Sequence, residues 1–159
     1  MIGIRIVIGL SVSAMSLHAQ SGSALEADSL VGCYKLVDSR GHAVFDGAGF
    51  HGSVIRLDSV RTAQVSQKSR VPNARAFWPA ESHPDPGHFP LSFFVPYWYV
   101  SGDTLYLIRT DGFNGDLVRL SGNAKRLSGT VEFFTDVVPP KPPPLHPVTA
   151  ERVACPSVR

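Results

Sequence analysis

The feature that most constrains the fold is a series of short apolar segments separated by tight turns in the C-terminal half. The turns, at residues 101–103, 112–115 and 121–123, are rich in glycine, asparagine and aspartate. Glycine and asparagine tolerate the positive φ that tight hairpins require. The strands expected between the turns are 93–100, 104–110, 116–120 and 126–135. Consecutive strands with such turns predict an antiparallel meander.

Alternation of side chains predicts which faces of these strands are buried. In 126–135, one face carries Leu127, Gly129, Val131 and Phe133, and the other face is mostly polar. The 104–110 strand is apolar on both faces, so we expect it to be covered on both sides. No segment repeats apolar residues with helical spacing over three turns, and helices should be short or absent. The sequence therefore predicts an all-β fold, a single antiparallel meander closed or nearly closed into a barrel of about eight strands.

The rest of the chain adds strands and two proline-rich segments. The further strands expected are 30–37, 53–57, 61–66 and 148–154. Residues 71–90 hold five prolines, which favours a long surface excursion over a central strand. Residues 139–147 hold six prolines and predict a polyproline II connector.

Residues 1–19 have the pattern of a cleaved signal peptide. Arg5 precedes an apolar run of ~12 residues, which is short of the ~20 that a permanent membrane span needs, and Ala19 offers a cleavage site. The expected location is therefore secreted or periplasmic, with no transmembrane segment. The expected organisation is a polar lead-in at 20–29, one β-barrel domain at 30–155 and a tail at 156–159.

Cys33 and Cys155 bracket the expected domain. In an oxidising compartment such a pair predicts one structural disulfide, which would tie the two terminal strands together. A second interpretation stays open, because residues 30–33, Leu-Val-Gly-Cys, resemble the lipobox whose cysteine is lipidated in bacterial lipoproteins. The pair lacks the C-x-x-C spacing of a metal site.

Composition excludes several classes of function. Charged residues make up 18% and the net charge is +2, which falls to +1 once Arg5 is removed with the signal. Such a chain is neither a disordered tail nor a nucleic-acid-binding arm, and it has no glycine-rich phosphate loop.

Three short features of the chain are Gly32-x-Tyr34 in the first expected strand, Thr110 followed by Asp111, and Arg152 near the end of the last expected strand. They resemble features of the lipocalins, a family within the calycin superfamily of small β-barrels. Residues 32–34 resemble the G-x-W of the lipocalin first strand, and Thr110–Asp111 resembles the T-D of a later loop. The resemblance implies that Arg152 packs over the aromatic ring of Tyr34. This chain has tyrosine in place of the usual tryptophan, and no C-terminal helix is visible. Most of residues 30–155 also resembles a group of short exported bacterial proteins. This resemblance implies no particular activity.

Aromatic residues are concentrated in the middle of the chain, where ten of the fifteen lie between residues 77 and 113. An eight-stranded barrel is just wide enough to hold its own side chains or one small ligand, and aromatic residues at its mouth would suit an apolar molecule. The predicted ligand-binding residues are Phe77, Trp78, Phe94, Trp98, Tyr106 and Phe113. The alternative is that these rings fill the core.

Motifs for metal binding and catalysis are weak. His83, Asp85 and His88 share a short loop whose chemistry suits zinc or copper, but their spacing is irregular, and we predict no metal and no cofactor. No nucleophile elbow is present, and Glu132 and Asp136 are expected on the solvent face. The predicted function is an exported, non-catalytic module that binds a small apolar ligand in the barrel. The alternatives are a structural or protein-interaction β-domain with a filled core and a small barrel hydrolase or isomerase; the oligomeric state stays open.

Overall fold

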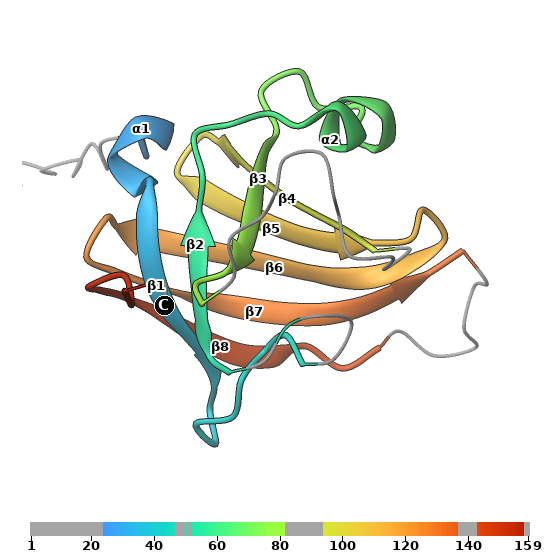
Figure 1. Ribbon diagram of the computed structural model, residues 1–159. Coiled ribbons are helices and arrows are strands. Elements are labelled where there is room, and N and C mark those ends of the chain that lie inside the picture. The colour runs from blue at the N-terminus through green and yellow to red at the C-terminus, as the bar shows by residue number, and fades with distance from the viewer. Residues whose placement is uncertain (1–23, 47–49, 51, 82–93, 137–142, 158–159) are drawn as a thin grey trace, which may run out of the picture.

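The computed structural model describes residues 24–46, 50, 52–81, 94–136 and 143–157 of the chain. Eight strands form one closed antiparallel barrel in which each strand pairs with its neighbour in sequence and β8 returns to β1 (Figure 1). The strands are β1 (Gly32–Asp38), β2 (Val54–Leu57), β3 (Arg75–Pro79), β4 (Val95–Ser101), β5 (Thr104–Thr110), β6 (Asn114–Asn123), β7 (Arg126–Thr135) and β8 (His146–Val153). The predicted all-β meander barrel is confirmed.

The first and last strands are joined both by hydrogen bonds and covalently. β1 pairs with β8 from Cys33 opposite Val153 to Asp38 opposite Val148. Cys33 and Cys155 form a disulfide across a sequence separation of 122 residues, as the sequence predicts.

Two short helices replace segments that the sequence analysis assigned otherwise. Residues 61–66 are not a strand, because α2 (Ala63–Lys68) occupies this segment. The hydroxyl of Thr62 accepts a hydrogen bond from the backbone N–H of Val65 at 3.1 Å, which is the standard N-cap contact. The lead-in contains α1 (Ala27–Leu30), whose last residue is fully buried.

The prediction that 71–90 is only a surface excursion is wrong, because β3 lies within it and pairs with both β2 and β4. Proline is tolerated here because Pro79 is the last residue of the strand and the four preceding residues carry none. The connector predicted for 139–147 is also shorter than expected. His146 and Pro147 already belong to β8, where Pro147 is opposite Thr130. Residues 82–93 and 137–142 lie outside the described part of the chain.

Side chains from all eight strands fill the barrel interior. The largest fully buried ones include Trp98, Tyr34, Phe45 and Phe77, together with leucines of β1, β2, β5, β6 and β7. A second cluster lies on the outer face, where Val65 of α2 packs with Trp78 and Tyr97 of β3 and β4. Trp98 and Tyr97 therefore point to opposite faces of β4, as the alternation predicts.

Candidate functional site

The two ends of the barrel are built differently. At one end, which we call the mouth, β1, β3, β5 and β7 finish and the other four strands begin. The mouth carries the long connection between β1 and β2 and the turn between β5 and β6. Helix α1 and the connection that contains α2 lie toward the other end (Figure 1).

The end opposite the mouth is closed by side chains. The guanidinium of Arg152 lies 5.7 Å from the centroid of the Tyr34 ring and donates hydrogen bonds to the carbonyls of Ser29 and Val31. The packing of Arg152 over Tyr34 that the lipocalin resemblance implies is therefore present. Burial of Tyr34 raises the pKa of its hydroxyl, against the opposing effect of Arg152. A hollow of about 250 Å³ on this side involves α1 and the β6–β7 turn, and it is smaller than the roughly 300 Å³ of a ligand pocket.

At the mouth, two phenylalanines from the β1–β2 connection enter the interior. Phe45 and Phe50 are 2% and 5% exposed, although neither belongs to a strand. Their rings lie 5.2 and 5.6 Å from the ring of Phe77 on β3, measured between centroids. These two residues, which we call the mouth phenylalanines, complete the interior packing at this end.

The charged side chain of Arg109 on β5 contacts this cluster. Arg109 follows Leu105 and Leu107 on the same face of the strand, so its side chain points toward the mouth interior. Its guanidinium carbon lies 5.3, 5.6 and 5.8 Å from the ring centroids of Phe45, Phe50 and Phe94. These distances are typical of cation–π contacts.

A carboxylate and a backbone carbonyl complete the surroundings of Arg109. Its Nε and Nη2 donate to Asp116 on β6 at 2.9 and 2.7 Å, in an ion pair whose side chains are 12% and 19% exposed. Its Nη1 donates to the carbonyl oxygen of Asp46 at 3.2 Å. Since β5 lies four places from β1 around the ring, this bond joins the β1–β2 connection to the opposite wall of the barrel. The connection therefore spans the mouth.

The turn between β5 and β6 is fixed by the predicted Thr110–Asp111 motif. The Thr110 hydroxyl accepts from the N–H of Gly112 and donates to the carbonyl of Asn114, and Asp111 accepts from the N–H groups of Phe113 and Asn114. These backbone hydrogen bonds hold the pKa of Asp111 below its usual value, and the bond from Asn114 has the largest effect. The motif thus has a structural role in the turn.

Asp111→Ala is expected to lower the melting temperature at neutral pH, because the turn loses two hydrogen bonds to a carboxylate. A depressed native-state pKa contributes stability above the unfolded-state pKa of about 3.9, and this contribution is lost as the pH falls through the native-state value. The difference in melting temperature between wild type and variant should therefore shrink below about pH 4, as thermal denaturation at several pH values would reveal. Asp136→Ala, which removes an exposed carboxylate at the same end, is the control. A difference that stays constant down to about pH 2 would contradict the assignment.

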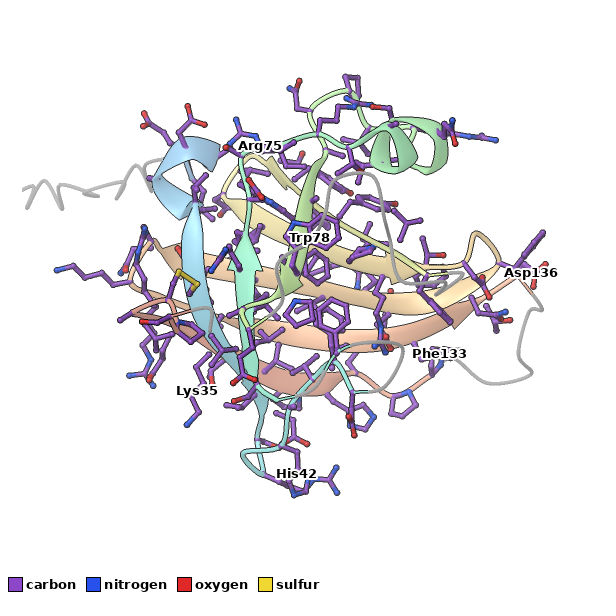
Figure 2. All side chains as sticks on the ribbon, in the orientation of Figure 1. Lys35, His42, Arg75, Trp78, Phe133 and Asp136 are labelled. Atoms are coloured by element: carbon purple, nitrogen blue, oxygen red, sulfur yellow. A yellow bond between two sulfur atoms is a disulfide. The ribbon has the colours of Figure 1, made fainter. Side chains whose placement is uncertain are left out.

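Large apolar side chains are exposed around the mouth. Phe113 is 65% exposed, Leu145 56% and Phe133 54%. Phe113 lies in the β5–β6 turn, Leu145 directly precedes β8, and Phe133 lies in the last part of β7. Figure 2 shows Phe133 and Asp136 at the right-hand side of the view, where β7 ends. The mouth therefore combines a buried aromatic cluster with an apolar rim.

The structure separates the six predicted ligand-binding residues. Phe77 and Trp98 lie in the interior, and Phe94 contacts Arg109 at the mouth. Trp78 and Tyr106 point to the outer face of the sheet, where Trp78 is buried in the cluster with Val65 of α2 and the Tyr106 ring stacks on that of Tyr99 at 4.8 Å. Phe113 is at the tip of the β5–β6 turn. The six residues do not converge on one site.

Four residues of the mouth cluster escaped the sequence analysis, namely Phe45, Phe50, Arg109 and Asp116. The signal that could have found Arg109 is its position on the apolar face of β5, two residues after Leu107, where a charge requires a partner. No comparable local signal marks the mouth phenylalanines.

The histidine pair His83 and His88, with Asp85, lies outside the described residues. Within the described ranges, no three histidine, cysteine, aspartate or glutamate side chains lie close enough together to hold a metal ion. Neither helix in the described part of the chain is long and apolar enough to cross a membrane.

Comparison with family models, with curated proteins and with solved structures gives no match for this chain.

Proposed function

We propose that this protein is an exported, non-catalytic binding module that takes a small apolar ligand at the mouth of the barrel. The observation that carries the proposal is the insertion of the mouth phenylalanines, Phe45 and Phe50, into the interior from a connection that is not part of the sheet. Side chains held by the eight strands cannot leave without breaking the barrel. Those carried by a connection can move aside and leave apolar space.

The size and chemistry of that space fit a ligand with one or two rings. Each buried phenylalanine covers roughly 150 to 250 Å² of surface, so a molecule that replaces the Phe45 ring would contact its neighbours Phe50 and Phe77 over a comparable area. The exposed rim residues Phe113 and Phe133 would extend the apolar contact outward.

Export is the second part of the proposal. It is supported by the signal-like pattern of residues 1–19 and by the Cys33–Cys155 disulfide, since disulfides persist in oxidising compartments. The lipocalin-like arrangement of Tyr34 and Arg152 is a further point of support for a binding barrel.

Phe45→Ala is expected to bind a neutral apolar probe, N-phenyl-1-naphthylamine, about tenfold more tightly than wild type. The variant leaves space in the mouth, so the probe no longer has to displace the Phe45 ring, and a tenfold change corresponds to about 1.4 kcal/mol. The measurement is a fluorescence titration at a temperature where circular dichroism shows both proteins folded.

Val60→Ala is the control, because it removes an exposed apolar side chain at the end of the barrel opposite the mouth and should leave the affinity unchanged. Native mass spectrometry of protein from exporting cells provides an independent test. The proposal fails if neither wild type nor Phe45→Ala binds the probe and no adduct accompanies the purified protein.

A second candidate function is a protein-interaction β-domain. It is favoured by the filled interior together with the three exposed apolar residues at the rim, Phe113, Phe133 and Leu145. Here the rim would contact a partner protein, and changing Phe113 and Phe133 to serine would abolish that complex, whereas Phe45→Ala would not strengthen binding of any small molecule.

A further inference from the structure

The surroundings of Arg109 form a complete recognition site for a cation. Three aromatic rings, those of Phe45, Phe50 and Phe94, lie within 5.8 Å of its guanidinium carbon, and Asp116 supplies the opposite charge at 2.7 Å. Aromatic faces combined with a carboxylate are the groups that bind ammonium and guanidinium ligands in other contexts. In this structure the position is filled by a side chain of the protein itself.

This inner position differs from an ordinary surface ion pair. The pair formed by Arg119 and Glu132 on the outer face has the same 2.7 Å separation, but its arginine is 39% exposed, against 12% for Arg109. Low exposure strengthens both the attraction to the carboxylate and the cation–π contacts, because water screens them less.

We infer that the mouth binds a small organic cation, an ammonium or guanidinium group on an apolar body, and that the Arg109 side chain occupies its place in the ligand-free protein. The inference rests on the proposed function and specifies the class of ligand. The charged group of the ligand replaces the guanidinium beside Asp116 and lies against the rings of Phe50 and Phe94, while the apolar body takes the place of the Phe45 ring. Arg109 moves outward on its flexible stem to solvent. The number of charges in the site is unchanged, so the exchange leaves no carboxylate unpaired.

An anionic ligand fits this site poorly. A carboxylate that bound Arg109 would either compete with Asp116 or lie beside it, and like charges at close range repel. Asp46 and Asp111 also lie in the connections at the mouth, and Arg40 at the same end is already paired with Asp38 at 3.3 Å. The electrostatic arrangement therefore favours a positive ligand.

The test uses three probes that share a phenylbutyl body, namely 4-phenylbutylamine, 4-phenylbutanol and 4-phenylbutyrate, with affinities measured by titration calorimetry. For wild type, the amine should bind about tenfold more tightly than the alcohol, and the butyrate most weakly. In Arg109→Ala the preference for the amine over the alcohol should rise further, about tenfold, because the internal competitor is gone. In Asp116→Asn it should fall to about one, because the carboxylate is lost.

Arg119→Ala and Glu132→Gln are the matched controls and should leave all three affinities unchanged. Thermal denaturation tests whether each variant is folded. If Arg109→Ala is unfolded, Arg109→Gln takes its place, and the three probe affinities of Arg109→Gln and of wild type test the inference.

Equal binding of amine and alcohol to wild type would overturn this inference and leave the proposed function standing. Tightest binding of the butyrate, lost in Arg109→Ala, would replace the cation site with an anion site. Binding of none of the three probes to wild type or to Arg109→Ala would count against both proposals.

Discussion

Replacing Cys33 and Cys155 together with alanine is expected to lower the free energy of unfolding by about 4 to 5 kcal/mol. The disulfide closes a loop across 122 residues, which contains most of the eight strands, and thereby restricts the unfolded ensemble more than a short loop would. It also holds β8 against β1, where the barrel closes. The measurement is denaturant unfolding of the oxidised protein and of the double variant.

Reduced wild type is the control for this experiment, because it loses the bond but keeps both side chains. Its unfolding midpoint should match that of the double variant. Intact mass should rise by two hydrogen atoms on reduction. Coincident midpoints for oxidised wild type and the double variant would show that the bond does not stabilise the fold.

Trp98→Ala is expected to cost about 3 to 5 kcal/mol of stability. The Trp98 side chain is fully buried in the barrel, and its indole N–H donates to the carbonyls of Asp58 and Ala76, both at 3.0 Å. Arg75, which also pairs with Asp28 of α1 at 2.7 Å, lies 5.4 Å from the ring. The variant therefore loses interior packing, a shared hydrogen-bond donor and a cation–π contact, as denaturant unfolding should detect.

One further variant separates the contributions of the ring and the N–H of Trp98, and a second variant, at an exposed ring, is the control. Trp98→Phe keeps an aromatic ring but removes the N–H, so its stability should lie between those of wild type and Trp98→Ala. Phe113→Ala removes a ring that is 65% exposed and should change stability by less than about 0.5 kcal/mol. A loss of less than about 1 kcal/mol in Trp98→Ala would show that the interior tolerates the cavity.

The barrel could be predicted because its determinants are local. The turns after β4 and β5 contain glycine with positive φ, Gly102 and Gly112, and these residues help to fix where each hairpin reverses. Alternation along β7 correctly identified Leu127 as buried, and the bracketing cysteines identified the disulfide. The same alternation was wrong for Phe133, which is 54% exposed because it lies near the mouth end of the strand.

The remaining features depend on contacts between residues far apart in sequence. β3 was not predicted because it has only five residues and lies in a proline-rich segment. α2 was not predicted because its six residues are too few to show helical periodicity. The mouth site depends on a bond between Arg109 and the carbonyl of Asp46, 63 residues apart. Neither partner's neighbourhood in the sequence indicates the other.

The pairing of β1 with β8 also determines when the protein can finish folding. Strand β8 leaves the ribosome after the other seven, so β1 waits for one of its two neighbours throughout synthesis. Until then β1 and β7 each present unpaired backbone groups, which are templates for association with other chains. A chain that ends before residue 146 would therefore form an open sheet instead of a smaller barrel. Its edge strands, β1 and β7, would have unpaired backbone groups, and such a chain is expected to aggregate.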